Sequence, residues 1–145
     1  MPAKILMLLS TAITLTLGVF HLYYTFQGPL LTPSDPALQI RMTQIAPVIS
    51  QQTTMWRLWL GFNASHSMGL ILFSLVFGCL ALSHSQVLFQ SPFLLAVGLA
   101  MLTGMLALCK LYFFSGPFNS MSVALFCYVA SIVLSRLLHF HLSPS

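Results

Sequence analysis

Four long apolar runs dominate the pattern of hydrophobic and polar positions along the chain. They cover residues 5–26, 55–82, 91–114 and 118–138, and each has the length of about 20 residues that a helix needs to cross a membrane. Polar stretches of unequal length separate the runs. The pattern therefore predicts an all-α, multi-pass membrane protein with one domain, residues 1–145, built as an antiparallel four-helix transmembrane bundle.

The first connection, residues 27–54, is long and contains a typical helix start. Asp35 is suited to be the N-cap of a helix and Pro36 its first residue. We expect a short helix here that lies in the membrane interface over the mouth of the bundle. A connection of this length is expected to act as a lid, with an inert spacer as the alternative. In the alternative arrangement, Pro47 begins the second long helix early and that helix protrudes from the membrane.

The other two connections are short. Residues 83–90 are predicted to form a short polar link. Residues 115–117 are predicted to form a tight turn, because Gly116 and Pro117 interrupt the helical pattern.

Small and hydroxyl residues recur at every fourth position in each long run. Lipid supplies no hydrophobic force that pulls helices together, so we expect these residues to let neighbouring helices approach closely. The predicted packing positions are Ser10, Thr14 and Gly18; Gly61, Ser65 and Gly69; Ala96, Ala100 and Gly104; and Cys127, Ser131 and Ser135.

The composition supports a membrane protein and excludes several other classes. Of the 145 residues, 58% are hydrophobic and 4% are charged, whereas soluble domains carry about a quarter charged residues. The net charge of +4 reflects five basic residues and the single acid Asp35, and such scattered cations do not form a nucleic-acid-binding surface. The three cysteines lie in apolar runs without paired spacing, which argues against disulfides and zinc. The first run lacks a signal-peptide cleavage site, so we expect a retained span.

Polar and aromatic side chains gather in the first half of the second run. At helical spacing, Trp59, Asn63 and His66 share one face, Trp56 lies at its margin and Arg57 lies on a different face. Polar groups are costly inside a membrane, so Asn63 and His66 are expected to face the bundle interior. The first face predicts a pocket with polar groups and aromatic walls. In the alternative interpretation, the tryptophans belong to an interfacial aromatic belt, and Asn63 and His66 only form hydrogen bonds that join neighbouring helices.

Residues from two other runs are expected at the same end of the bundle. The complete set of candidate ligand-binding residues is Trp59, Asn63, His66, Lys110, Arg57, His21, Trp56 and Tyr112. Counted from the helix ends, His21 and His66 differ in depth by roughly 9 Å at a rise of 1.5 Å per residue. This offset predicts no shared metal or haem site. The spans contain no carboxylate, so His66 is the one expected acid–base group if a reaction is catalysed.

Four segments of the first half of the chain resemble a known group of proteins. The segments are Gly18-Val-Phe-His-Leu-Tyr-Tyr-Thr25, Ser34-Asp-Pro36, Thr54-Met-Trp-Arg-Leu-Trp59 and Gly61-Phe-Asn-Ala-Ser-His-Ser-Met-Gly69. They resemble small four-helix bacterial integral membrane proteins of unknown function. The resemblance implies the four-helix architecture and a bacterial source, and it assigns no catalytic residue.

The chemistry at the long-connection end predicts a binding function. Cations and hydrogen-bond donors outnumber carboxylates there, which favours a lipophilic ligand with a polar or anionic head, such as a quinone or a lipid. Two alternatives stay open: an accessory or structural subunit of a larger membrane complex, and a small membrane enzyme that uses His66. The expected partners are membrane lipids, and a second copy or another membrane protein that packs on the small-residue faces. The sequence specifies no cofactor.

The distribution of cations predicts the orientation. Four spans place both termini on one side, together with Lys4 and Arg136, whereas Arg41 lies in the long connection. Because cytoplasmic segments carry an excess of Lys and Arg, the termini are expected in the cytoplasm and the protein in a bacterial inner membrane.

Overall fold

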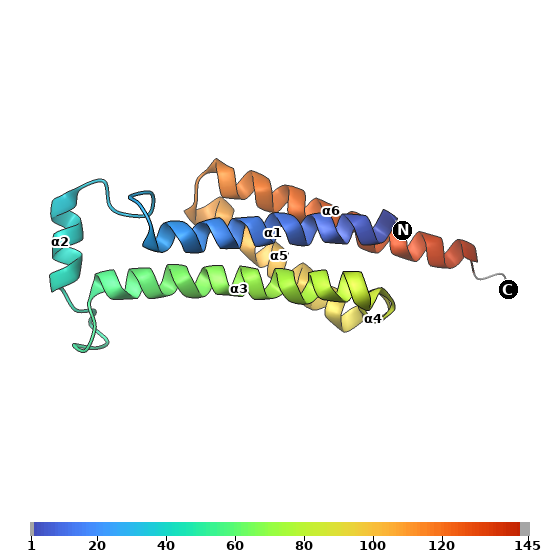
Figure 1. Cartoon of the computed structure of the whole chain (residues 1–145), viewed down its shortest axis with the longest axis horizontal. Coiled ribbons are helices and arrows are strands. Elements are labelled where there is room, and N and C mark those ends of the chain that lie inside the picture. The colour runs from blue at the N-terminus through green and yellow to red at the C-terminus, as the bar shows by residue number, and fades with distance from the viewer. Residues whose placement is uncertain (1, 143–145) are drawn as a thin grey trace. The chain divides into compact units, whose positions relative to one another are not determined.

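The computed structural model describes the backbone of residues 2–142 and the side chains of residues 2–138. Helices are the regular elements of this part of the chain (Figure 1). In order they are α1 (Pro2–Phe26), α2 (Pro36–Gln44), α3 (Met55–Ser83), α4 (Ser85–Gln90), α5 (Pro92–Tyr112) and α6 (Ser115–Leu142).

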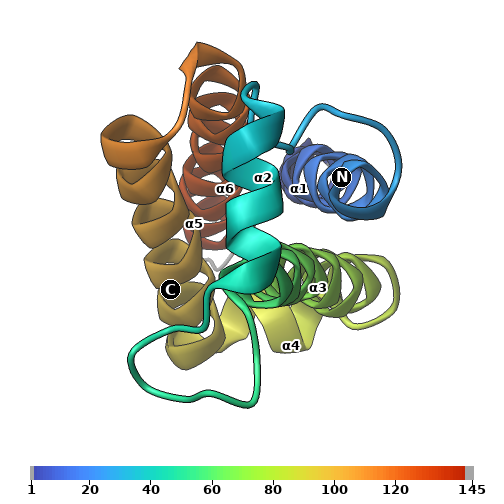
Figure 2. The same cartoon turned by 90° about the vertical axis from the view of Figure 1, so that its left-hand side faces the viewer.

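Local sequence signals define the connection between α1 and α3. Gly28 follows the end of α1 with a φ of 82°, a left-handed conformation that glycine adopts without steric cost and that commonly ends a helix. At the start of α2, the Asp35 carboxylate accepts a hydrogen bond of 2.9 Å from the backbone N–H of Ala37. α2 has no buried residue, and it runs across the direction of α1 and α3 between the end of one and the start of the other (Figure 2). α3 begins at Met55 and not at Pro47.

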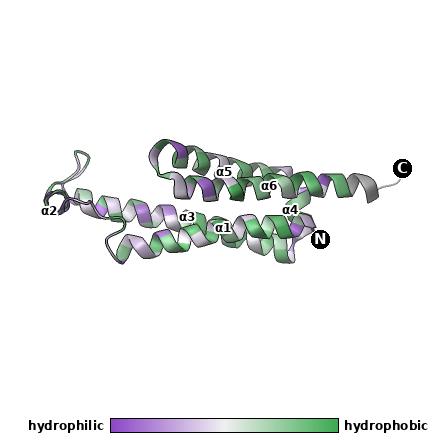
Figure 3. Ribbon diagram, turned by 90° about the horizontal axis from the view of Figure 1, so that it is seen from above, coloured by the Kyte–Doolittle hydropathy of each residue, from purple (hydrophilic) through white to green (hydrophobic). Residues whose placement is uncertain are grey.

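Four helices of the described chain match the apolar runs. α1, α3, α5 and α6 are long and apolar enough to cross a membrane, and hydrophobic residues predominate along all four (Figure 3). These helices fit a multi-pass membrane protein.

Both short connections differ from the predictions. Residues 83–90 are not simply a polar link, because α4 occupies most of them and buries Leu88 completely. The predicted turn at residues 115–117 is also wrong, since α6 already begins at Ser115. A proline in the first turn of a helix removes no intrahelical hydrogen bond, and Pro117 therefore continues the helix that it was expected to interrupt.

The chain divides into two compact units. The first unit comprises Met1–Thr16 and Ile71–Ser145, and the second unit comprises Leu17–Leu70. The boundary passes through α1 and α3, so each of these helices contributes to both units. The single domain expected from the sequence stays a prediction.

Buried hydroxyl groups join the helices of the first unit. The Ser10 hydroxyl of α1 donates to the Ala124 carbonyl of α6 at 2.8 Å, and the hydroxyls of Thr14 and Ser74 lie 2.7 Å apart between α1 and α3. Ser10 and Thr14 have no exposed surface. The prediction that these two residues of α1 face neighbouring helices is confirmed.

The close approach between α5 and α6 depends on Gly98 and Tyr128. Tyr128 is fully buried, and its hydroxyl donates to the Leu95 carbonyl at 3.0 Å. The Tyr128 ring occupies the space that a side chain at Gly98 would need. The sequence did not single out either residue, and the packing positions that it predicted on α5 are exposed: Ala96, Ala100 and Gly104.

Candidate functional site

The polar residues of the second unit meet where the last turns of α1 lie beside the first half of α3. Asn63 is 6% exposed, whereas His21 and His66 are partly buried. The predicted inward orientation of Asn63 is confirmed by its burial. We call His21, Asn63 and His66 the polar cluster.

Asn63 is held in one orientation by two hydrogen bonds. Its Nδ2 donates to the Trp59 carbonyl at 2.8 Å, which leaves Oδ1 to accept from His21 Nε2 at 3.0 Å. Reversal of the amide would place its carbonyl oxygen against the Trp59 carbonyl oxygen. The hydrogen-bond network therefore assigns the proton of His21 to Nε2.

His21 and His66 lie much closer together than their positions in the helices suggest. The centroids of the two rings are 5.3 Å apart, and the ring planes are inclined by 61°. The predicted depth offset of roughly 9 Å is wrong because the end of α1 and the start of α3 do not lie at the same level. α3 begins beyond the end of α1, where Trp59 Nε1 donates to the carbonyl of Leu31 in the long connection at 3.0 Å.

Two hydroxyl residues outside the set of candidate ligand-binding residues bond to the backbone of the polar cluster. Thr25 donates to the His21 carbonyl at 2.7 Å, and Ser67 donates to the Asn63 carbonyl at 2.8 Å. Both are buried. The available signal was their position four residues after His21 and Asn63, where a hydroxyl on a helix reaches the preceding carbonyl.

The remaining candidates of the second unit surround the cluster less closely. Trp59 is 42% exposed and reaches the long connection, so it ties that connection to α3 and does not form a buried wall. Trp56 is partly buried and Arg57 is exposed. The expectation that Arg57 points away from the face of His66 agrees with this exposure.

Lys110 and Tyr112 belong to the first unit. They lie in the last turn of α5, and both side chains are exposed. Their participation in one site with the polar cluster stays a prediction.

The small-residue face of α3 does not pack as predicted. Gly61 and Ser65 are exposed, and within the described structure nothing lies within 4 Å of a Cβ built at Gly61 or Gly69. Within the second unit, no helix approaches this face closely. The face stays open because the buried side of this part of α3 is the one that carries Asn63 and Ser67.

The donor set limits the chemistry that the polar cluster can perform. It offers two imidazole rings and one amide, and these groups can donate to, or accept from, the oxygen atoms of a polar head group. Among the described residues, no three His, Cys, Asp or Glu side chains are placed to hold a metal ion. Asp35, the only acidic residue of the sequence, is used as the N-cap of α2.

Comparison with protein-family models, with curated proteins and with solved structures finds no match to this chain.

Proposed function

We propose that the four long helices form an antiparallel transmembrane bundle. Within the first unit, Lys4 Nζ donates to the Leu82 carbonyl at 2.6 Å, and Thr14 contacts Ser74. Partner numbers on α3 thus fall as residue numbers on α1 rise, which is the order of two helices that run in opposite directions. In the second unit, α1 and α3 are also joined, by the hydrogen bond between His21 and Asn63.

The orientation and location follow from this topology as parts of the same proposal. An antiparallel bundle of four spans places both termini on one side. Lys4 and Arg136 then outnumber Arg41 of the long connection, and the cation excess supports cytoplasmic termini in a bacterial inner membrane. In this orientation, α2 lies in the membrane interface on the side opposite to the two termini.

We further propose that the protein binds the polar head of a lipophilic molecule, a quinone or a lipid, at the polar cluster. One observation carries this proposal: two helices bring two imidazoles and a buried amide together, with the histidine rings 5.3 Å apart. Polar residues at such positions in membrane helices are costly and commonly serve function. The absence of acidic residues from these helices favours a ligand whose head is neutral and rich in acceptors, or anionic.

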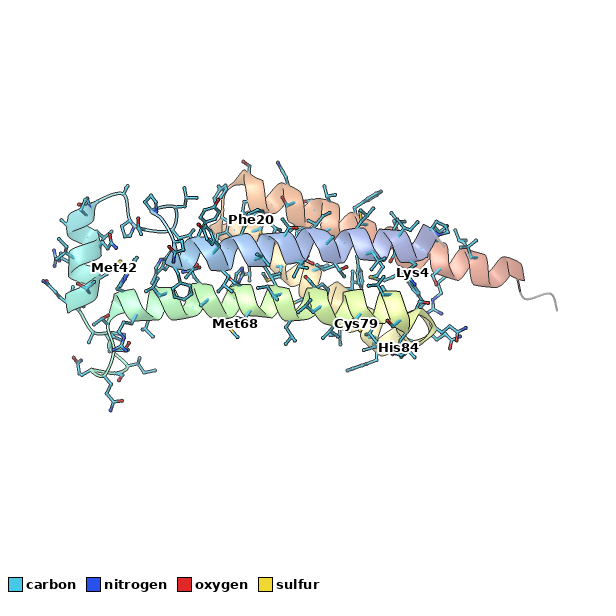
Figure 4. All side chains as sticks on the ribbon, in the orientation of Figure 1. Lys4, Phe20, Met42, Met68, Cys79 and His84 are labelled. Carbon is cyan, nitrogen blue, oxygen red and sulfur yellow. The ribbon has the colours of Figure 1, made fainter. Side chains whose placement is uncertain are left out.

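The proposal is tested by the ligand content of the purified protein. The protein is extracted in mild detergent, examined by native mass spectrometry and then extracted with organic solvent to identify the retained molecule. We expect His66→Ala to lose this molecule, because one of the two imidazoles is removed. His84→Ala is the matched control, since His84 is exposed at the junction of α3 and α4 (Figure 4).

The thermal unfolding midpoint of the same preparations separates binding from packing. A polar residue that serves only to join helices contributes about 0.6 kcal/mol on average. If His66→Ala lowers the midpoint but retains the molecule in the original amount, the polar cluster is structural and the binding proposal is wrong.

A second candidate function is that of an accessory subunit in a larger membrane complex. The open face of α3 favours it, because nothing in the described structure lies within 4 Å of a Cβ built at Gly61 or Gly69. Small residues on an open face allow a helix of another chain to approach closely.

A further inference from the structure

The segment between α2 and α3 forms a loop whose two ends are joined by a backbone hydrogen bond. The backbone N–H of Met55 donates to the Ile45 carbonyl at 2.9 Å and joins the two ends. Within the loop, the N–H of Ser50 donates to the Pro47 carbonyl at 3.2 Å, and the Ser50 hydroxyl accepts from the N–H of Gln52 at 3.1 Å. We call this segment the 45–55 loop.

Two large apolar residues occupy the tip of the 45–55 loop. Val48 and Ile49 are the central residues of the turn that the hydrogen bond between Ser50 and Pro47 closes. Their relative exposures are 104% and 91%, so neither side chain is covered by the protein. The central positions of turns usually carry glycine, proline or small polar residues. A fully exposed Val-Ile pair in this position therefore indicates a surface that covers it.

The surroundings of the loop identify that surface as lipid. The loop leads directly into α3, a candidate membrane span, and it stands out from the first turn of that helix (Figure 2). Trp56 and Trp59 follow within that helix, and tryptophan is enriched where spans meet the head groups. The loop therefore leaves the helix at the depth of the membrane interface.

The charges around the loop fit the same surface. The sequence has no charged residue between Arg41 and Arg57, so insertion of the loop desolvates no ion. Arg41 and Arg57 flank the uncharged segment, and both side chains are exposed. Their positive charge complements the phosphate groups of lipid heads.

We propose that the 45–55 loop inserts Val48 and Ile49 into the lipid of the membrane that α3 spans. The loop then anchors the end of α2 at the interface and limits the movement of the long connection over the polar cluster. This proposal rests on the membrane location of the protein and is independent of a ligand at the polar cluster.

Lipid contact is tested with a fluorophore placed at the tip. Cysteine is introduced by Ile49→Cys or, as the matched control, by Gln51→Cys, in a chain whose native cysteines are replaced by alanine: Cys79, Cys109 and Cys127. Ile49 and Gln51 are both exposed and lie in the same loop, so both variants should fold. Each is labelled with the polarity-sensitive fluorophore NBD and reconstituted into phosphatidylcholine vesicles with or without doxyl-labelled phosphatidylcholine in both leaflets. The thermal unfolding midpoint of each labelled protein is compared with that of the unlabelled chain, to check that the labelled protein is folded.

The two labels distinguish lipid from water and from protein. We expect the label at residue 49 to emit at shorter wavelength than the label at residue 51 and to lose more of its fluorescence to the doxyl lipid. Equal quenching of the two labels, or emission typical of water from both, would overturn the proposal. A blue-shifted label at residue 49 that the doxyl lipid does not quench would also overturn it, because the tip would then contact protein.

Discussion

The substitution Gly98→Ala tests the closest helix contact of the first unit. A Cβ at this position would overlap the Tyr128 hydroxyl and lie 2.7 Å from Tyr128 Cζ and 2.8 Å from Phe77 Cε1. Tyr128 is fully buried and Phe77 is 5% exposed, so neither ring can move aside into free space. Accommodation of the methyl group requires α5 and α6 to separate, or Tyr128 to give up its hydrogen bond to Leu95.

The expected loss of stability is the difference between opposing effects. Overpacking of a filled core costs about 1–3 kcal/mol, and an interhelical hydrogen bond in a membrane protein contributes about 0.6 kcal/mol. Alanine favours a helix over glycine by up to about 1 kcal/mol, which offsets part of this loss. We therefore expect Gly98→Ala to lower the free energy of unfolding by about 1–2 kcal/mol.

The same change at Gly104 provides the control for this measurement. Gly104 lies in the same helix as Gly98, but nothing in the described structure is within 4 Å of a Cβ there. Reversible unfolding by SDS in mixed micelles, followed by circular dichroism, should show Gly98→Ala as less stable than Gly104→Ala. The double variant Gly98→Ala with Tyr128→Phe should recover part of the loss, because the overlapping hydroxyl is gone. Equal stability of the two alanine variants would refute this account of the α5–α6 contact.

Two further substitutions test the interhelical contacts and the open face of α3. Thr14→Val removes the buried hydrogen bond to Ser74 and should lower the free energy of unfolding by about 0.6 kcal/mol. Thr16→Val is the control and should not lower it, because the Thr16 hydroxyl is exposed and bonds within its own helix. Equal effects of the two changes in the SDS titration would contradict a stabilising role of the Thr14–Ser74 contact. Gly61→Leu should leave the thermal unfolding midpoint unchanged, because nothing in the described structure lies within 4 Å of a Cβ built at this position. If the protein assembles through this face, the same change should reduce the particle size in size-exclusion chromatography with light scattering. A lower midpoint with unchanged particle size would mean that Gly61 packs within the chain.

Several features of the fold could be predicted from short stretches of sequence. The four apolar runs correspond to the four long helices, with the first ending at Phe26 and the second beginning at Met55 as expected. The burial of Asn63 was also predictable. These features depend on the hydropathy of one run or on one residue and its immediate neighbours, and local sequence therefore contains the information.

The relative level of the helices could not be predicted in this way. His21 and His66 were expected at different depths because both were counted from helix ends. Their rings are 5.3 Å apart, since α3 starts beyond the end of α1. That shift depends on contacts of the long connection, such as the hydrogen bond from Trp59 to the Leu31 carbonyl, and the pattern of either helix alone contains no information about it.

The choice of the buried face of each helix was also decided by tertiary structure. Small residues at fourfold spacing pointed correctly to Ser10 and Thr14, whereas nothing in the described structure lies within 4 Å of a Cβ built at Gly61 or Gly104. In a soluble helix, hydrophobicity itself marks the buried side. Lipid is as apolar as a protein interior, so an apolar run identifies a helix that is able to span a membrane but does not mark its buried side. Which face of that helix meets a neighbour is determined by how side chains such as Tyr128 fit against the adjoining helix.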